Sequence, residues 1–138
     1  MKALILVLLI SLLGCGEKYK SINKDDLVGT WESRNSKIII EKNLTGKIDI
    51  TLSHNYGVPD FKPEHFGGSA RFLIRNMETY DIFDIELLNE NGDNALTSLR
   101  IGAINNEYVI YEGNDLNTAA IIYHKKTEAS KTPKHSNL

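Results

Sequence analysis

Cys15 carries the only thiol of the chain, so no intramolecular disulfide can form. It follows Lys2 and an apolar run, Ala3–Leu13, that is interrupted only by Ser11. A basic start, a short apolar stretch and a small residue before the cleavage point are the parts of a secretory signal. The run is shorter than the roughly 20 apolar residues that a membrane-spanning helix needs. The sequence therefore predicts a leader that is removed, and a catalytic thiol is not expected so near the start of the processed chain.

The tetrapeptide Leu12–Cys15 resembles the lipobox of bacterial lipoproteins. The resemblance implies that residues 1–14 are a signal peptide, cut before Cys15, and that acyl chains such as palmitate are attached to Cys15. One acyl chain binds a bilayer only marginally, whereas two or three hold a protein there stably. Because Gly16 is not Asp, the family's sorting rule implies the outer membrane, facing the periplasm, in a source with two membranes. The competing interpretation is a secreted protein with an unmodified cysteine.

Catalytic and metal-binding chemistry has little support elsewhere. His54, Asp60, Glu64 and His65 have no spacing typical of a metal site. The motifs of hydrolase nucleophiles, phosphate loops and dinucleotide sites are missing. Asp81, Asp84 and Glu86 alternate with apolar residues, which predicts a solvated strand face. We therefore expect no catalytic residue, no metal and no cofactor.

One long connection, Ser53–Ser69, is predicted to carry function, because long irregular loops in compact domains usually do. Its aromatic residues Tyr56, Phe61 and Phe66, together with Trp31, are the candidate ligand- or partner-binding residues. The alternative is a lid packed for stability.

Short runs rich in β-branched and aromatic residues predict eight strands, and no helical period follows the leader. Short links between the strands favour antiparallel neighbours, and closing them into a barrel removes both exposed edges. We therefore expect an all-β, eight-stranded antiparallel meander that closes into a barrel, with a two-sheet sandwich as the alternative. The predicted strands are 28–33, 37–42, 47–52, 70–76, 79–88, 95–104, 107–111 and 118–125.

The expected organisation is a signal peptide (1–14), a lipidated Cys15 with a polar tether (15–26), one barrel domain (27–126) and a polar tail (127–138). Residues 1–14 contain one charged side chain, that of Lys2, so the processed chain keeps 15 Lys and Arg against 18 Asp and Glu. With charges of both signs scattered, no concentrated basic face is expected, which argues against a nucleic-acid partner.

Leu27–Trp31, read Leu-Val-Gly-Thr-Trp, resembles the Gly-x-Trp opening of lipocalins and fatty-acid-binding proteins. The resemblance implies that Gly29 bends the first strand and that Trp31 plugs one end of the barrel. In lipocalins an Arg often packs on that Trp after the last strand, where this chain has Lys125 and Lys126.

The sequence leaves two functions open, and the lipocalin-like opening favours the first of them. The first is a membrane-anchored barrel that binds a small apolar ligand or an envelope lipid. The second is a periplasmic protein-interaction lipoprotein, such as an inhibitor, an immunity protein or an assembly accessory, with a solid barrel. The volume of the barrel interior distinguishes them, since a ligand site encloses a few hundred Å³.

Overall fold

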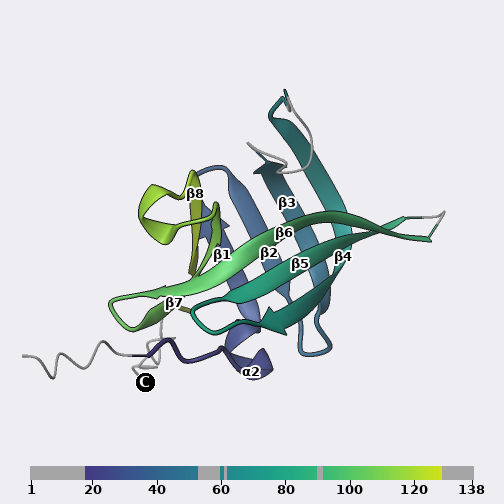
Figure 1. The fold of residues 1–138 in the computed structure, drawn as a ribbon. Helices are drawn as coiled ribbons and strands as arrows, with labels where there is room; N and C mark the ends of the chain where they lie inside the picture. The colour runs from purple at the N-terminus through teal and green to yellow at the C-terminus, as the bar shows by residue number, and fades with distance from the viewer. Residues whose placement is uncertain (1–17, 53–59, 61, 90–91, 129–138) are drawn as a thin grey trace, which may run out of the picture.

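The structure is a computed structural model that describes residues 18–52, 60, 62–89 and 92–128. Eight antiparallel strands form one closed barrel in simple meander order, which confirms the predicted barrel and excludes the sandwich (Figure 1). Within the described ranges, no helix is long and apolar enough to cross a bilayer. A short helix, α2 (Lys24–Leu27), precedes the barrel. The strands are β1 (Gly29–Ser33), β2 (Ser36–Ile40), β3 (Thr45–Leu52), β4 (Glu64–Asn76), β5 (Asp81–Asn89), β6 (Gly92–Ile104), β7 (Glu107–Glu112) and β8 (Ile121–Lys125).

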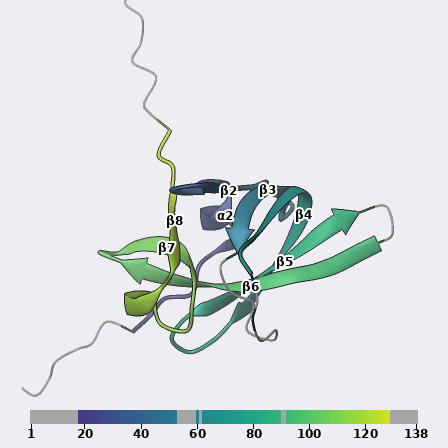
Figure 2. The ribbon, with the colours of Figure 1, turned by 90° about the horizontal axis from the view of Figure 1, so that it is seen from above.

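The barrel closes through a narrow seam. β1 and β8 share only the pairs Trp31↔Lys125 and Glu32↔His124, whereas β5 and β6 are paired from Asp81 to Asn89. One further backbone bond, from Lys126 N to Thr30 O at 2.8 Å, extends the seam. The far ends of β5 and β6 extend beyond the other strands, as both ribbon views show (Figures 1 and 2).

The two ends of the barrel differ in what covers them. We call the lower end the one that carries the β2–β3, β4–β5 and β6–β7 connections, at the bottom of Figure 1. There the chain before β1 packs along the barrel, first as residues 18–23, which we call the strap, and then as α2. The upper end carries the β1–β2 connection, at Arg34 and Asn35, and the start of β4.

The interior is filled by the inward residues of the strands, which alternate with outward polar residues as a barrel requires. Phe72 and Phe83 stack at its centre, with ring centroids 5.3 Å apart and planes inclined by 12°. The largest fully buried side chains are Trp31, Tyr123, Phe72, Phe83, Leu27, Ile38, Ile40, Ile50, Leu52, Ile85, Leu99 and Ile101. These side chains have almost no surface that water can reach, so no water-sized void lies beside them. This part of the barrel is therefore packed like a protein core.

Trp31 is buried where α2 packs against the barrel. Its indole Nε1 donates a hydrogen bond to Leu27 O at 2.8 Å, and the side chain is 1% exposed. Gly29 has a φ of 136°, a region that suits glycine. Lys125 lies over the indole ring with Nζ 5.8 Å from its centroid, and this ammonium also donates to Asp26 O. A lysine therefore covers the tryptophan here.

Several predicted strand boundaries differ from the observed ones, and the largest difference is at the start of β4. Residues 64–69 belong to β4 and not to the long loop, because each of them pairs with a residue of β3, from Leu52↔Glu64 to Lys47↔Ser69. Two glycines and a serine made this segment resemble a loop, but pairing with a neighbouring strand outweighs weak β-propensity. The predicted last strand, 118–125, begins three residues later, at Ile121. Thr118 instead ends a 3₁₀ turn, Leu116–Thr118, whose Asn117 N donates to the carboxylate of Asp115.

The predicted polar tether was also wrong for residues 19–26. Ile22 is 6% exposed and belongs to the core, and the backbone and side chains of the strap are hydrogen-bonded to the barrel. By contrast, the short link between the predicted strands 95–104 and 107–111 is a tight hairpin turn, in which Asn105 and Asn106 have φ values of 51° and 66°.

Candidate functional site

The predicted site residues do not form one site. Cys15, Tyr56 and Phe61 lie outside the described residues. Trp31 is sealed into the core, so no surface partner reaches it. Phe66, in β4, lies opposite the buried Ile50 of β3 and packs against the hydrophobic core, so it belongs to the barrel wall.

The candidate metal ligands are dispersed. His54 lies outside the described residues, and Asp60, Glu64 and His65 are exposed. His65 Nε2 lies 2.9 Å from Asp49 Oδ1 across β3 and β4, on the outer face. Among the residues that the structure describes, no three His, Cys, Asp or Glu side chains come together as metal ligands would.

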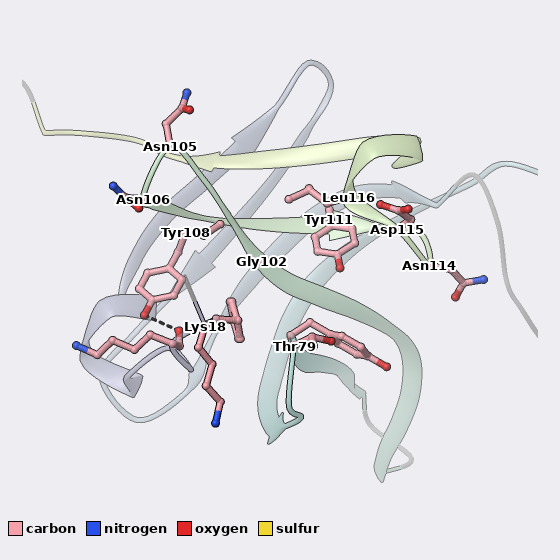
Figure 3. A pocket seen from close by; sticks show the side chains of 14 residues that line it. Lys18, Thr79, Gly102, Asn105, Asn106, Tyr108, Tyr111, Asn114, Asp115 and Leu116 are labelled. Carbon is pink, nitrogen blue, oxygen red and sulfur yellow. Dashed lines mark hydrogen bonds between the residues drawn. The ribbon is translucent and has the colours of Figure 1, made fainter. Parts of the chain in front are cut away.

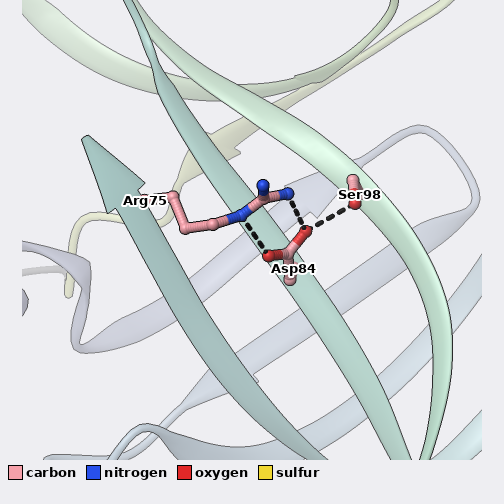
Figure 4. Close-up of polar contacts among 3 residues, drawn as sticks. All are labelled: Arg75, Asp84 and Ser98. Carbon is pink, nitrogen blue, oxygen red and sulfur yellow. Dashed lines mark hydrogen bonds and ion pairs between the residues drawn. The ribbon is translucent and has the colours of Figure 1, made fainter. Parts of the chain in front are cut away.

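The acidic residues of β5 divide between the two faces. Asp84 faces outward, where Arg75 donates two hydrogen bonds to its carboxylate (2.7 and 3.0 Å) and Ser98 donates a third (Figure 4). Burial alone would raise the pKa of Asp84, but the bonds from Arg75 and Ser98 outweigh it and lower that pKa. Exposed ion pairs of this kind contribute little to stability. Here both carboxylate oxygens of Asp84 accept hydrogen bonds.

Asp81, in contrast, is fully buried, so its predicted place on a solvated face was wrong. Its carboxylate accepts three hydrogen bonds from the strap, from Tyr19 OH (2.9 Å), Ser21 Oγ (3.0 Å) and Ile22 N (2.9 Å). Charge-assisted bonds to a carboxylate are among the stronger ones in proteins. We call this arrangement the Asp81 clamp, because it fastens the strap across the lower end of the barrel.

A groove of about 850 Å³ opens on the outside of β6 and β7, beside the strap (Figure 3). Its size lies within the roughly 300–1,000 Å³ of protein binding sites. Four of the six tyrosines of the chain line it, and we call it the tyrosine groove. The lining residues are Lys18, Tyr19, Lys20, Thr79, Tyr80, Gly102, Ala103, Asn105, Asn106, Tyr108, Tyr111, Asn114, Asp115 and Leu116.

Gly102 leaves room for the side chains around it. A Cβ added there would lie 3.2 Å from Tyr111 Cε1 and 3.4 Å from Leu116 Cδ2, so these two side chains cover the glycine closely. Arg100, two residues earlier in β6, bridges the upper part of the groove. Its guanidinium carbon lies 4.4 Å from the ring centroid of Tyr80, and it donates hydrogen bonds to the backbone and side-chain oxygens of Asn114. The groove walls are thus held by defined contacts.

The lower rim of the groove is held by the strap. Tyr108 OH donates to Lys20 O at 2.9 Å, the bond drawn in Figure 3, and Tyr19 OH donates to Asp81. Burial, together with Asp81, raises the pKa of Tyr19, and burial also raises the pKa of Tyr108 and of Tyr111. These phenols stay neutral at physiological pH. The groove therefore presents neutral phenols, amides, the exposed carboxylate of Asp115 and the exposed ammonium groups of Lys18 and Lys20. These groups can form hydrogen bonds and ion pairs with a bound molecule.

A second polar group lies within the barrel, near its upper end. Tyr123 is fully buried, and burial, with a smaller effect of the nearby Glu112, raises its pKa to about 12, although the neighbouring Ser36 side chain opposes the rise. The Tyr123 hydroxyl has no hydrogen-bond partner among the residues that the structure describes. Ser36 Oγ accepts from Thr51 N at 3.0 Å. Tyr123 is 0% exposed, so this cluster adds no open space to the described interior.

The tyrosine groove was not predicted from the sequence. Its residues come from the strap, the β4–β5 turn, the β6–β7 hairpin and the turn before β8, and no local spacing connects them. The one available signal was the hairpin 105–108, which places two asparagines and a tyrosine at the end of a strand pair.

Comparison of the chain with protein-family models, with curated proteins and with solved structures finds no significant match.

Proposed function

We propose that this protein is a lipid-anchored lipoprotein of the cell envelope that binds another protein through the tyrosine groove. The observation that supports a protein partner most directly is the groove itself, with its fixed tyrosines, its neighbouring asparagines and its two lysines. The anchor rests on the lipobox-like Leu12–Cys15 and its leader. Of the two functions left open by the sequence, this is the interaction lipoprotein with a solid barrel.

The composition of the groove supports a protein partner. Antibody binding loops use tyrosine for rigid contact area and asparagine, serine and glycine for adaptable hydrogen bonds. The groove combines Tyr80, Tyr108 and Tyr111 with Asn105, Asn106 and Asn114 in the same way. Because contacts within the protein already hold Tyr19, Tyr80 and Tyr108, binding there would cost little side-chain ordering.

The packed interior argues against the small apolar ligand. Such a ligand would need an enclosed apolar volume, but large interior side chains such as Trp31, Phe72 and Tyr123 are 0–1% exposed and belong to one hydrophobic cluster. Binding of a small apolar ligand inside the barrel is therefore the result that would replace the proposed function. Saturable binding of a fluorescent fatty acid by the purified barrel would favour that function.

Groove variants test the protein partner. A photo-crosslinking residue at Asn114, on the groove in the turn before β8, is expected to give a discrete protein adduct in cells, and the same residue at Asn35, exposed outside the groove, is not. With the captured partner purified, Tyr80→Ala combined with Tyr108→Ala should weaken binding at least about tenfold, because buried tyrosines are frequent interface hot spots. Titration calorimetry gives the affinities.

The matched control is Ile39→Ala combined with Leu73→Ala, which removes two exposed apolar side chains outside the groove. Circular dichroism checks that both double variants remain folded. Equal affinities for the two double variants, or equal adducts at Asn114 and Asn35, would contradict a partner in the groove.

A separate experiment tests the anchor. Cys15→Ala is expected to accumulate as an uncleaved, unacylated precursor, because the lipid-bearing thiol is the group on which the processing of a lipoprotein depends. Mass spectrometry of the membrane fraction gives the mass of each form, and Ser11→Ala, within the leader, is the control that should be processed normally. Normal cleavage of the Cys15 variant would refute the lipoprotein assignment.

A further inference from the structure

We infer that the lower end of the barrel rests on the bilayer surface, in one fixed orientation. The inference rests on the proposed lipid anchor and adds to it the face of the domain that meets the membrane. It depends on three features of the described residues, which are the strap, the Asp81 clamp and Met77.

The first step is the length of chain between anchor and barrel. Tyr19 is already bonded to Asp81, and Cys15 lies only four positions before it. At about 3.3–3.6 Å per residue, this link spans at most about 14 Å. An acylated Cys15 sits in the headgroup region, so Tyr19 and the clamp must lie within about that distance of it.

The second step is the stiffness of the attachment. The strap is held by three bonds to Asp81, by Tyr108 OH on Lys20 O and by the burial of Ile22 in the core. Burying an isoleucine side chain contributes roughly 1.5–3 kcal/mol. A strap held in this way cannot swing freely, so the short link fixes which end of the barrel approaches the membrane.

The third step is the surface that the lower end presents. Met77, in the β4–β5 turn next to Asp81, is 44% exposed, the largest value among the exposed large apolar side chains of the described chain. Lys18, Lys20 and Lys24 are exposed nearby, with Asp25, Asp26 and Glu78. The two charge signs balance, so contact does not depend on anionic lipid. A zwitterionic bilayer is therefore the appropriate partner surface.

Fluorescence quenching tests the orientation. The acylated protein is reconstituted in phosphatidylcholine vesicles that contain a headgroup-labelled quenching lipid, with a dye on a cysteine introduced as Met77→Cys or as Asn35→Cys. Acylation leaves Cys15 without a free thiol, so the introduced cysteine is the sole labelling site. The dye at position 77 should be quenched at least about threefold more than the dye at position 35, because quenching falls steeply with distance. Equal quenching would overturn the inference.

A second pair of variants tests the clamp. Asp81→Asn keeps the size of the side chain but offers one acceptor oxygen where three donors converge, so the difference between positions 77 and 35 should shrink. Tyr19→Phe removes one donor and should give an intermediate value while leaving the barrel folded. A difference unchanged in both variants would show that the clamp does not set the orientation.

The proposed function and this inference fail in distinguishable ways. Intact mass of the purified protein is measured first, and an unacylated Cys15 would end the lipoprotein proposal before any vesicle experiment. An acylated protein with equal quenching at both positions would leave the anchor in place and exclude only the fixed orientation.

Discussion

Gly46→Ala is expected to lower the free energy of unfolding by about 3 kcal/mol, at the upper part of the range for overpacked sites. A Cβ at this position would lie 1.8 Å from Ile39 O, a backbone atom that cannot move without disturbing β2. The same Cβ would lie 3.2 Å from a ring carbon of Phe72, in the central aromatic stack. The β2–β3 pairing at Ile40↔Gly46 would have to open.

Gly67→Ala is the matched control for this substitution. Gly67 is also a strand glycine, but an added Cβ would come no closer than 3.8 Å to Ile48 O, which is ordinary van der Waals contact. Its effect should stay within about 0.5 kcal/mol, typical of surface changes. Urea titrations followed by circular dichroism compare the midpoints, and coincident midpoints for the two alanine variants would show that β2 can yield at Ile39.

Trp31→Ala is expected to lower the free energy of unfolding by about 3–5 kcal/mol, the usual cost of removing a buried tryptophan. The substitution leaves a cavity at the lower end and removes the indole N–H that donates a hydrogen bond to Leu27 O. Trp31→Phe keeps a ring but loses the N–H, so it should cost less, about 1–3 kcal/mol for the unsatisfied carbonyl and the lost volume.

Leu73→Ala is the control for the tryptophan variants, because Leu73 is 42% exposed on the outer face and its removal opens no cavity. Trp31 is the only tryptophan, so circular dichroism must replace fluorescence as the unfolding signal. If Trp31→Ala lowers the free energy of unfolding no more than Leu73→Ala does, then the buried indole does not stabilise the lower end of the barrel.

Much of the fold was predictable because the relevant signals are local. Alternation in Ile48, Ile50 and Leu52 identifies a strand with one buried face, and Asn105-Asn106 suits the positive φ of a tight hairpin. Eight such strands with short links leave few topologies other than a meander, and closure removes the edges. These arguments need no knowledge of which distant residues meet.

The errors came from residues whose state depends on distant partners. Asp81 shares the odd-numbered face of β5 with the buried Phe83 and Ile85, so its period already placed it inside. A carboxylate there is stable only with donors, and these come from a strap about sixty residues earlier. Likewise, the tyrosine groove assembles from four separate segments, and no pattern within one segment could reveal it.

The long sequence separation of the Asp81 clamp has a consequence for the order in which the molecule takes shape. Tyr19 and Asp81 are 62 residues apart, and the acceptor belongs to the fifth strand of the meander. As the chain emerges from its amino end, the earliest segment must wait for β5 before it can dock. The strap is thus one of the last parts of the described domain to be immobilised.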